Sequence, residues 1–164
     1  MYRPMLLLDV DGVISLFGFD HRRPPAGHYA LVDGTMHFLS ATAATLIVEL
    51  ARAFELVWCT GWEEKADEHL PAQLGLPRGL AHLTFVADAT ESATTAMPPR
   101  HWKLEAIDTF AGPRRPLAWI DDAHDDSCRQ WAAERAGPTL LVVTEPAIGI
   151  TDAHVRALRE WAAL

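Results

Sequence analysis

The chain has 164 residues, 49% of them hydrophobic, and a formal net charge of −8 from 22 acidic and 14 basic side chains. This length favours one domain, predicted over residues 1–164, because domains usually hold roughly 100–200 residues. The composition excludes a disordered or fibrous chain. The acidic balance argues against strong non-specific binding to nucleic acid. No apolar run approaches the ~20 residues of a membrane span.

Two further features bear on the cellular compartment. The apolar stretch before Asp9 is too short to resemble a signal peptide. Two cysteines, Cys59 and Cys128, form no disulfide framework, which fits a reducing compartment. We therefore expect a cytoplasmic protein with no membrane partner.

Short apolar runs alternate with helix-like segments along the chain. The predicted strands cover residues 5–10, 55–59, 83–86, 117–120 and 140–144. The predicted helices cover residues 41–54, 63–74, 102–110, 127–135 and 152–163. Nearly continuous apolar runs are typical of strands that are buried on both faces of a parallel sheet. The alternation predicts an α/β fold with a doubly wound, parallel five-stranded sheet.

One region, residues 14–39, interrupts this alternation. Within it, residues 28–32 and 35–39 flank Asp33-Gly34, a pair that suits the type I′ turn of a β-hairpin. We expect this region to form a small β-hairpin flap after the first strand, over the edge where the strands have their carboxyl ends.

Paired acidic residues follow two of the predicted strands. Asp9 and Asp11 end the first strand, and Asp121 and Asp122 end the fourth. The carboxyl ends of strands form the ligand-binding edge of an open α/β sheet, so these carboxylates are expected to lie close together. Like charges held close repel each other, and Mg²⁺ offsets them, since it prefers carboxylates, water and substrate phosphate as ligands. The pattern therefore predicts a Mg²⁺ site.

The same edge carries groups suited to phosphoryl transfer. An aspartate there can form an aspartyl phosphate, and a second carboxylate can protonate the leaving oxygen and activate water. The second strand ends in Thr60-Gly61, and Lys103 stands near a predicted helix start. A hydroxyl and a cation can bind phosphoryl oxygens as their charge redistributes. Lys65, the other of the two lysines, is the alternative phosphate ligand.

In this order, the motifs resemble the four motifs of the haloacid dehalogenase (HAD) superfamily. They are Asp9-Val-Asp-Gly-Val, the strand ending in Thr60, Lys103, and the strand ending in Asp121-Asp122. Their tryptophan-rich neighbours resemble a compact HAD subgroup common among bacterial proteins. The resemblance covers almost the whole chain and implies an HAD-like Rossmannoid fold. It also implies Mg²⁺-dependent phosphatase chemistry, because members that attack carbon–halogen bonds lack the second aspartate.

The resemblance implies a role for each matching acid. Asp9 is expected to be the nucleophile and a metal ligand. Asp11 is expected to be the general acid and base, with its main-chain carbonyl on the metal. Asp121 is expected to bind Mg²⁺ directly, and Asp122 directly or through water.

The resemblance also implies the phosphate site and the kind of cap. Thr60 and Lys103 are expected to hold the transferring phosphoryl group, with Gly61 and Trp62 beside them in the substrate site. The short segments after the first motif and before Lys103 leave room only for a flap and a loop. The chain thus resembles a minimally capped (C0-like) member with an open site.

The leading hypothesis is a Mg²⁺-dependent phosphohydrolase. Its phosphorylated substrate is a nucleotide, a nucleic-acid end, a sugar phosphate or a phosphoprotein. One alternative is a metal-dependent nuclease that activates water directly, and another is a non-catalytic HAD-like module that binds a phosphorylated ligand or a partner. A receiver domain is disfavoured because its Asp, Thr and Lys come in a different order.

Two further acids follow the fourth predicted strand. Asp125 and Asp126 either support the metal site or cap the helix that follows.

Overall fold

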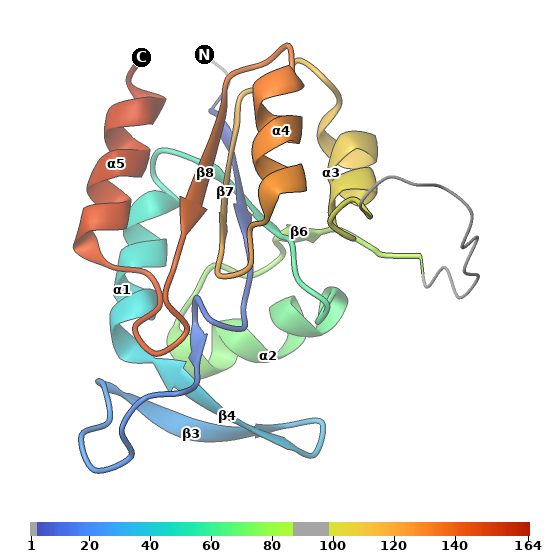
Figure 1. The fold of residues 1–164 in the computed structure, drawn as a ribbon. Helices are drawn as coiled ribbons and strands as arrows, with labels where there is room; N and C mark the ends of the chain where they lie inside the picture. Colours follow the sequence, from blue (N-terminus) through green and yellow to red (C-terminus); the bar gives the residue numbers. More distant parts are fainter. Residues whose placement is uncertain (1–2, 87–98) are drawn as a thin grey trace.

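The computed structural model describes residues 3–86 and 99–164, which form two sheets (Figure 1). The predicted loop before Lys103 falls largely on residues 87–98, outside the described residues. The larger sheet is parallel, with the strand order β6-β5-β1-β7-β8. Its strands are β1 (Met5–Leu8), β5 (Glu55–Trp58), β6 (Ala81–His82), β7 (Leu117–Asp121) and β8 (Thr139–Val143). This arrangement confirms the predicted doubly wound, parallel five-stranded α/β sheet.

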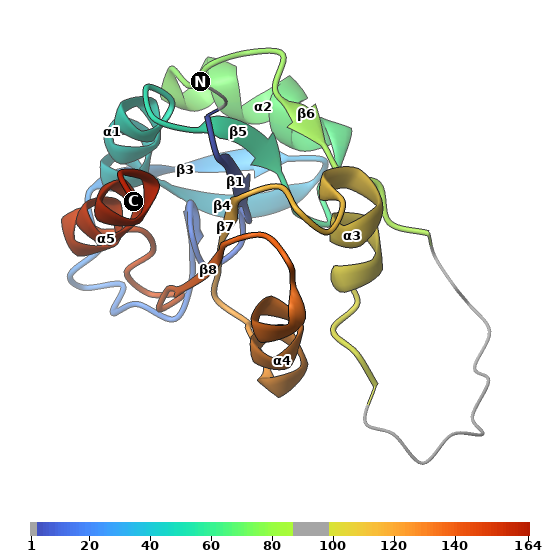
Figure 2. The same ribbon diagram turned by 90° about the horizontal axis from the view of Figure 1, so that it is seen from above.

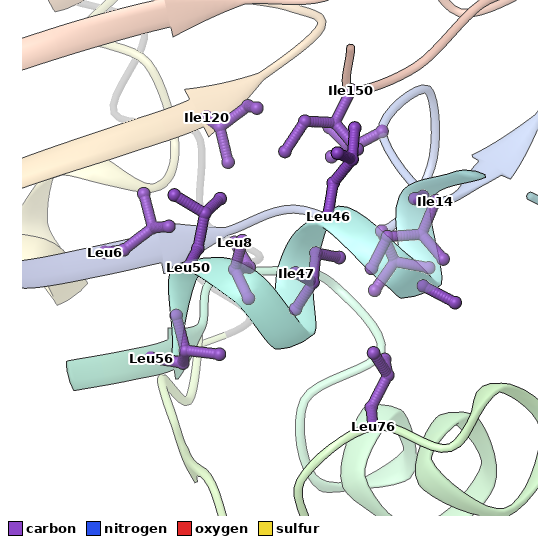
Figure 3. Close-up of a cluster of buried hydrophobic side chains, with 14 of the residues drawn as sticks. Leu6, Leu8, Ile14, Leu46, Ile47, Leu50, Leu56, Leu76, Ile120 and Ile150 are labelled. Atoms are coloured by element: carbon purple, nitrogen blue, oxygen red, sulfur yellow. The ribbon is translucent and has the colours of Figure 1, made fainter. Parts of the chain in front are cut away.

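Helices cover both faces of this sheet, as Figure 2 shows. They are α1 (Ala41–Leu50), α2 (Glu64–Leu74), α3 (Leu104–Ala111), α4 (Asp126–Glu134) and α5 (Asp152–Ala162). Leu6 and Leu8 of β1 belong to the cluster formed with α1, α2 and α5 (Figure 3). Met5 and Leu7 point the other way, into the cluster formed with α3 and α4. Burial on both faces explains why the strand sequence is continuously apolar.

The strand predicted at residues 83–86 is wrong. The edge strand β6 is instead Ala81–His82, which pairs with the end of β5. The Leu83 N–H still donates to a β5 carbonyl (2.9 Å). The Phe85 N–H then donates to the side chain of Glu63, just before α2 (3.0 Å). A side chain therefore replaces the sheet as hydrogen-bond partner, and the strand ends early.

The smaller sheet follows β1 and is antiparallel, with the order β2-β4-β3. Its hairpin strands, β3 (Gly27–Val32) and β4 (Thr35–Ser40), pair in register across Asp33 and Gly34. Both turn residues have positive φ (48° and 79°), as a type I′ turn requires, so the predicted hairpin is confirmed. The short strand β2 (Ser15–Leu16) was not predicted, since two residues carry no periodic pattern. Figure 1 places this sheet beyond the carboxyl end of β1.

Both cysteines are free and buried in the cluster against α3 and α4. Burial raises the pKa of the Cys59 thiol well above its ordinary range and raises that of Cys128 to about 11. Neither is a thiolate at neutral pH, which agrees with the predicted packing role. Within residues 3–86 and 99–164, no helix has the length and apolar character needed to cross a membrane.

Candidate active site

The carboxyl ends of β1, β5 and β7 meet the start of α3 at an open pocket of about 250 Å³. The residues that line it are Asp9, Asp11, Thr60, Gly61, His101, Trp102, Lys103, Asp121, Asp122 and Ala123. The structure thus brings together all of the predicted site residues except Trp62, which does not line the pocket but donates a hydrogen bond to Asp11. His101 was not predicted to belong to the site.

Lys103 lies buried between two carboxylates. Its side chain is 3% exposed, and its Nζ is 2.6 Å from Asp121 Oδ2 and 3.1 Å from Asp9 Oδ1. Lys65, the alternative lysine, lies on the exposed side of α2, where it pairs with Asp33 of the hairpin turn. Geometry therefore favours Lys103 as the lysine of this pocket.

The chain around Lys103 is held in place from two sides. Lys103 stands at the N-cap position of α3, and Leu104 and Ile107 bury that helix against the sheet. The main-chain N–H of His101 donates to the hydroxyl of Ser127 on α4 (2.8 Å). These contacts fix the direction from which the lysine enters the pocket.

Asp121, at the end of β7, is surrounded by donors. Its Oδ2 accepts from Lys103 Nζ and from the indole N–H of Trp119 (3.2 Å), and its Oδ1 accepts from the N–H of Ala123 (2.9 Å). Burial acts to raise the pKa of Asp121. The charge of Lys103 and the hydrogen bonds outweigh burial and hold the pKa below its ordinary value. Trp119, predicted as a core residue, is fully buried and also orients this carboxylate.

The single positive charge of Lys103 faces two carboxylates, and Asp9 is the one that it balances less well. Its Oδ1 accepts from the N–H of Val10 (2.8 Å) and from Lys103. Burial and the charge of Asp121 nevertheless raise the pKa of Asp9 to about 7, against the opposing effect of Lys103. Burial acts to lower the pKa of Lys103, but the two carboxylates raise it above its ordinary value, so this lysine stays protonated.

Three of the predicted metal ligands form one acidic cluster. Asp9, Asp121 and Asp122 each bring a carboxylate oxygen within 4.8 Å of the others. Burial and the neighbouring Asp121 charge raise the pKa of Asp122. This all-oxygen donor set with excess negative charge fits Mg²⁺, which would be held by these three side chains. The carboxylate of Asp11 lies outside the cluster, and a metal contact through its main-chain carbonyl stays a prediction.

Gly12 makes room for Asp122, a member of the acidic cluster. Its φ is +80°, and a Cβ atom there would lie 2.4 Å from Asp122 Cγ. The hydroxyl of Thr144 donates to the Gly12 carbonyl (2.8 Å), so the backbone cannot easily retreat. Both the backbone conformation and the close approach therefore require glycine.

Gly12→Ala is expected to displace Asp122 and to weaken Mg²⁺ binding about 10- to 100-fold, the usual loss when a supporting contact is removed. Isothermal titration with Mg²⁺ measures the affinity. Gly18→Ala is the matched control, because Gly18 has a similar φ of +76° and no described atom within 4 Å of its Cβ position. Equal loss of affinity in both variants would contradict this role for Gly12.

Asp11 is half exposed and lies beside two aromatic side chains. The indole N–H of Trp62 donates to its Oδ2 (3.0 Å), and His37 Nδ1 lies 3.7 Å from its Oδ1. The two rings contact each other, with centroids 4.5 Å apart. His37 was not predicted to reach the site. The alternation of β4 offered a signal, since it places His37 on the same face as the buried Leu39.

Thr60 is buried at the end of β5 with its hydroxyl beside the pocket. The segment is anchored by the N–H of Cys59, which donates to the carbonyl of Leu8 (2.7 Å). Thr60 Oγ1 accepts from the N–H of Trp62 (3.3 Å). The hydroxyl proton is therefore available to a phosphoryl oxygen.

Asp125 caps the helix that follows, as one of the two predicted alternatives had it, whereas Asp126 does not. Asp125 is the N-cap of α4 and accepts from the N–H of Cys128 (3.0 Å) and the hydroxyl of Ser127 (2.6 Å). These hydrogen bonds lower the pKa of Asp125 to about 2. Asp126 is exposed and pairs with Arg129. Neither belongs to the acidic cluster found in the described residues.

A parallel sheet with acids after β1 and β7, and a buried lysine between them, has the arrangement of a haloacid dehalogenase (HAD) domain. Residues 5–155 match the model of a family described as the HAD domain in Swiss Army Knife RNA repair proteins, and the chain belongs to this family. The expected membership of the HAD superfamily is confirmed. No curated protein sequence matches the chain.

Proposed function

We propose that the protein is a Mg²⁺-dependent phosphomonoester hydrolase that works through an aspartyl phosphate on Asp9. The observation that supports this most is the buried Lys103 between Asp9 and Asp121, at a pocket that also receives Asp11 and Thr60. These are the groups that phosphoryl transfer to and from a carboxylate requires.

Asp9 has one oxygen available for attack. Its Oδ1 is engaged by Val10 and Lys103, whereas Oδ2 has no hydrogen-bond donor among the residues that the structure describes. Oδ2 forms a bond to phosphorus as the bond to the leaving oxygen breaks, and Asp11 gives that oxygen a proton. Water then attacks the phosphorus with Asp11 as base, which releases phosphate and regenerates Asp9.

The remaining groups hold the phosphoryl oxygens. The Thr60 hydroxyl and the Lys103 ammonium are placed to bind them and to stabilise charge as it redistributes. Asp9, Asp121 and Asp122 would hold Mg²⁺, which would supply further positive charge to the phosphoryl group.

We propose that the substrate phosphate stands at an RNA end. The family description refers to RNA repair proteins, and cleavage of RNA leaves a phosphate on one of the two new ends. Trp102, which is 57% exposed beside the pocket, offers a flat apolar face to a base. The net charge of −8 suits recognition of an end through a local pocket rather than along the whole backbone.

The proposed activity is tested by phosphate release from RNA oligonucleotides with a 3′- or 5′-terminal phosphate, compared with glycerol phosphate. We expect release with Mg²⁺ and none with EDTA. We also expect kcat/KM to be about tenfold or more higher for one RNA end, because stacking of a base is worth about 1–3 kcal/mol. Internal cleavage without phosphate release would instead support the nuclease, and Mg²⁺ binding without turnover would support the non-catalytic module.

We further propose that residues 1–164 form one domain that works in the cytoplasm. Support comes from the family match over residues 5–155 and from two free, buried cysteines.

A further inference from the structure

Asp11 is contacted by side chains from two elements outside the parallel sheet, Trp62 on the loop after β5 and His37 on β4. Its carboxylate is 51% exposed, so water alone would let it rotate. Trp62, on the loop between β5 and α2, donates its indole N–H to Oδ2 (3.0 Å). A tryptophan N–H can only donate, and this bond therefore fixes which oxygen acts as acceptor.

His37 packs against the ring of Trp62 and also lies near Asp11, with its Nδ1 3.7 Å from Asp11 Oδ1. It belongs to β4 of the antiparallel sheet, and its Nδ1 shares a hydrogen bond with Ser15 Oγ (3.0 Å) on β2. Its ring lies 4.5 Å from the ring of Trp62, at an angle of 60°. Only 16% of the His37 side chain is exposed, so its position is set by packing. The β3–β4 hairpin therefore contributes, through His37, to the surroundings of the Asp11 carboxylate.

We propose that Trp62 and His37 are positioning residues that fix Asp11 for proton transfer, an inference that rests on the proposed phosphatase function. Trp62 keeps Asp11 Oδ2 as a hydrogen-bond acceptor and leaves Oδ1 to exchange protons with the substrate. In the first step, the proton moves from Oδ1 to the leaving oxygen as its bond to phosphorus breaks. In the second step, Oδ1 takes a proton from the attacking water.

If Trp62 and His37 act only on proton transfer by Asp11, their removal should affect esters differently according to the leaving group. An ester with a poor leaving group, such as adenosine 3′-monophosphate, needs the general acid when its bond to phosphorus breaks. An ester with a good leaving group, such as 2,4-dinitrophenyl phosphate, hardly needs it. The ratio kcat/KM reports the first chemical step for both esters, so their comparison isolates the acid.

The test is kcat/KM of Trp62→Phe, which keeps an aromatic ring but loses the N–H. We expect kcat/KM to fall about 30-fold for adenosine 3′-monophosphate, which is part of the 10²- to 10⁴-fold rate enhancement that general acids contribute. For 2,4-dinitrophenyl phosphate we expect kcat/KM to fall less than about threefold. His37→Ala should show the same selective loss at about tenfold, and it provides the test if Trp62→Phe does not fold. Trp161→Phe is the matched control, because Trp161 stacks on Phe54 near the carboxyl end of α5 and should leave both values unchanged.

Equal losses for both esters would overturn the positioning role, since a general structural defect affects both alike. Unchanged values in both Trp62→Phe and His37→Ala would overturn it as well. If the wild-type protein hydrolyses neither ester, the proposed phosphatase function fails, and this inference fails with it. An active wild-type protein with a non-selective variant contradicts the inference alone.

Discussion

Asp9→Asn should abolish phosphate release, by about 10⁴-fold or more, and at the same time stabilise the metal-free protein. The loss of activity follows because an amide oxygen cannot form the aspartyl phosphate, and removal of a nucleophile costs a large part of the rate enhancement. The gain in stability follows from the charge balance of the pocket, where Lys103 faces the two carboxylates Asp9 and Asp121.

The effect on stability depends on pH in a defined direction. Burial raises the pKa of Asp9 from 3.8 to about 7 in the metal-free fold. Between about pH 4 and pH 7 the folded state therefore binds more protons than the unfolded state, and the free energy of unfolding falls as the pH rises. Asparagine does not ionise and avoids this loss. We expect Asp9→Asn to gain on the order of 2–4 kcal/mol at pH 8 and less at pH 5.

Urea unfolding in EDTA at pH 5 and pH 8 measures this difference. Asp20→Asn is the control, because Asp20 is exposed and accepts from the N–H of Arg22, a bond that asparagine can also accept. Mg²⁺ should stabilise the wild-type protein more than Asp9→Asn, since the variant lacks one ligand. If Asp9→Asn is less stable than wild type at both pH values, the excess of negative charge at Asp9 is refuted.

Lys103→Met should destabilise the protein by about 3–5 kcal/mol and remove most of its activity. Methionine has a similar volume but leaves two buried carboxylates without their cation, and breaking a buried ion pair from one side has a cost of this size. Lys65→Met is the control within the same protein. Its pair with Asp33 lies at the surface, where such pairs contribute about 0–1 kcal/mol.

A double variant separates loss of charge from loss of packing. Asp9→Asn combined with Lys103→Met removes the lysine and one of its two carboxylates. It should be more stable than Lys103→Met alone at pH 8 in EDTA, because less uncompensated charge remains buried. Equal free energies of unfolding for the two proteins would show that Lys103 stabilises the fold by packing, not by its charge.

The architecture could be predicted from the sequence wherever burial alone decides the structure. β1, β5, β7 and β8 are covered on both faces, so their apolar residues run together and their positions were evident. The acids at the ends of β1 and β7 followed from topology, because parallel strands end at the same edge. β6 was predicted at residues 83–86 but covers Ala81–His82, since its end depends on a hydrogen bond between Phe85 and the distant Glu63 side chain.

The pocket residues were predictable by type, but their mutual contacts were not. Trp62 and Asp11 are 51 positions apart in the chain, and their hydrogen bond exists only because β1 and β5 are neighbours. His37 lies near Asp11 because its strand packs beyond the end of β1, and the alternation of β4 indicated the buried face of His37 but not this contact. The capping role of Asp125 was one of two readings that local sequence allowed, and the geometry of α4 decided between them.

The most direct test of the phosphatase is to capture the phosphorylated intermediate in Asp11→Asn. With 2,4-dinitrophenyl phosphate and Mg²⁺, this variant should still transfer the phosphoryl group to Asp9, because the leaving group needs no acid. It should release phosphate slowly, because no base activates the water. Mass spectrometry after acid quenching should find one phosphoryl group per chain, on Asp9, together with one equivalent of released dinitrophenolate. Continued turnover with no phosphoryl group on Asp9 would show that water attacks directly, and it would contradict the aspartyl-phosphate mechanism.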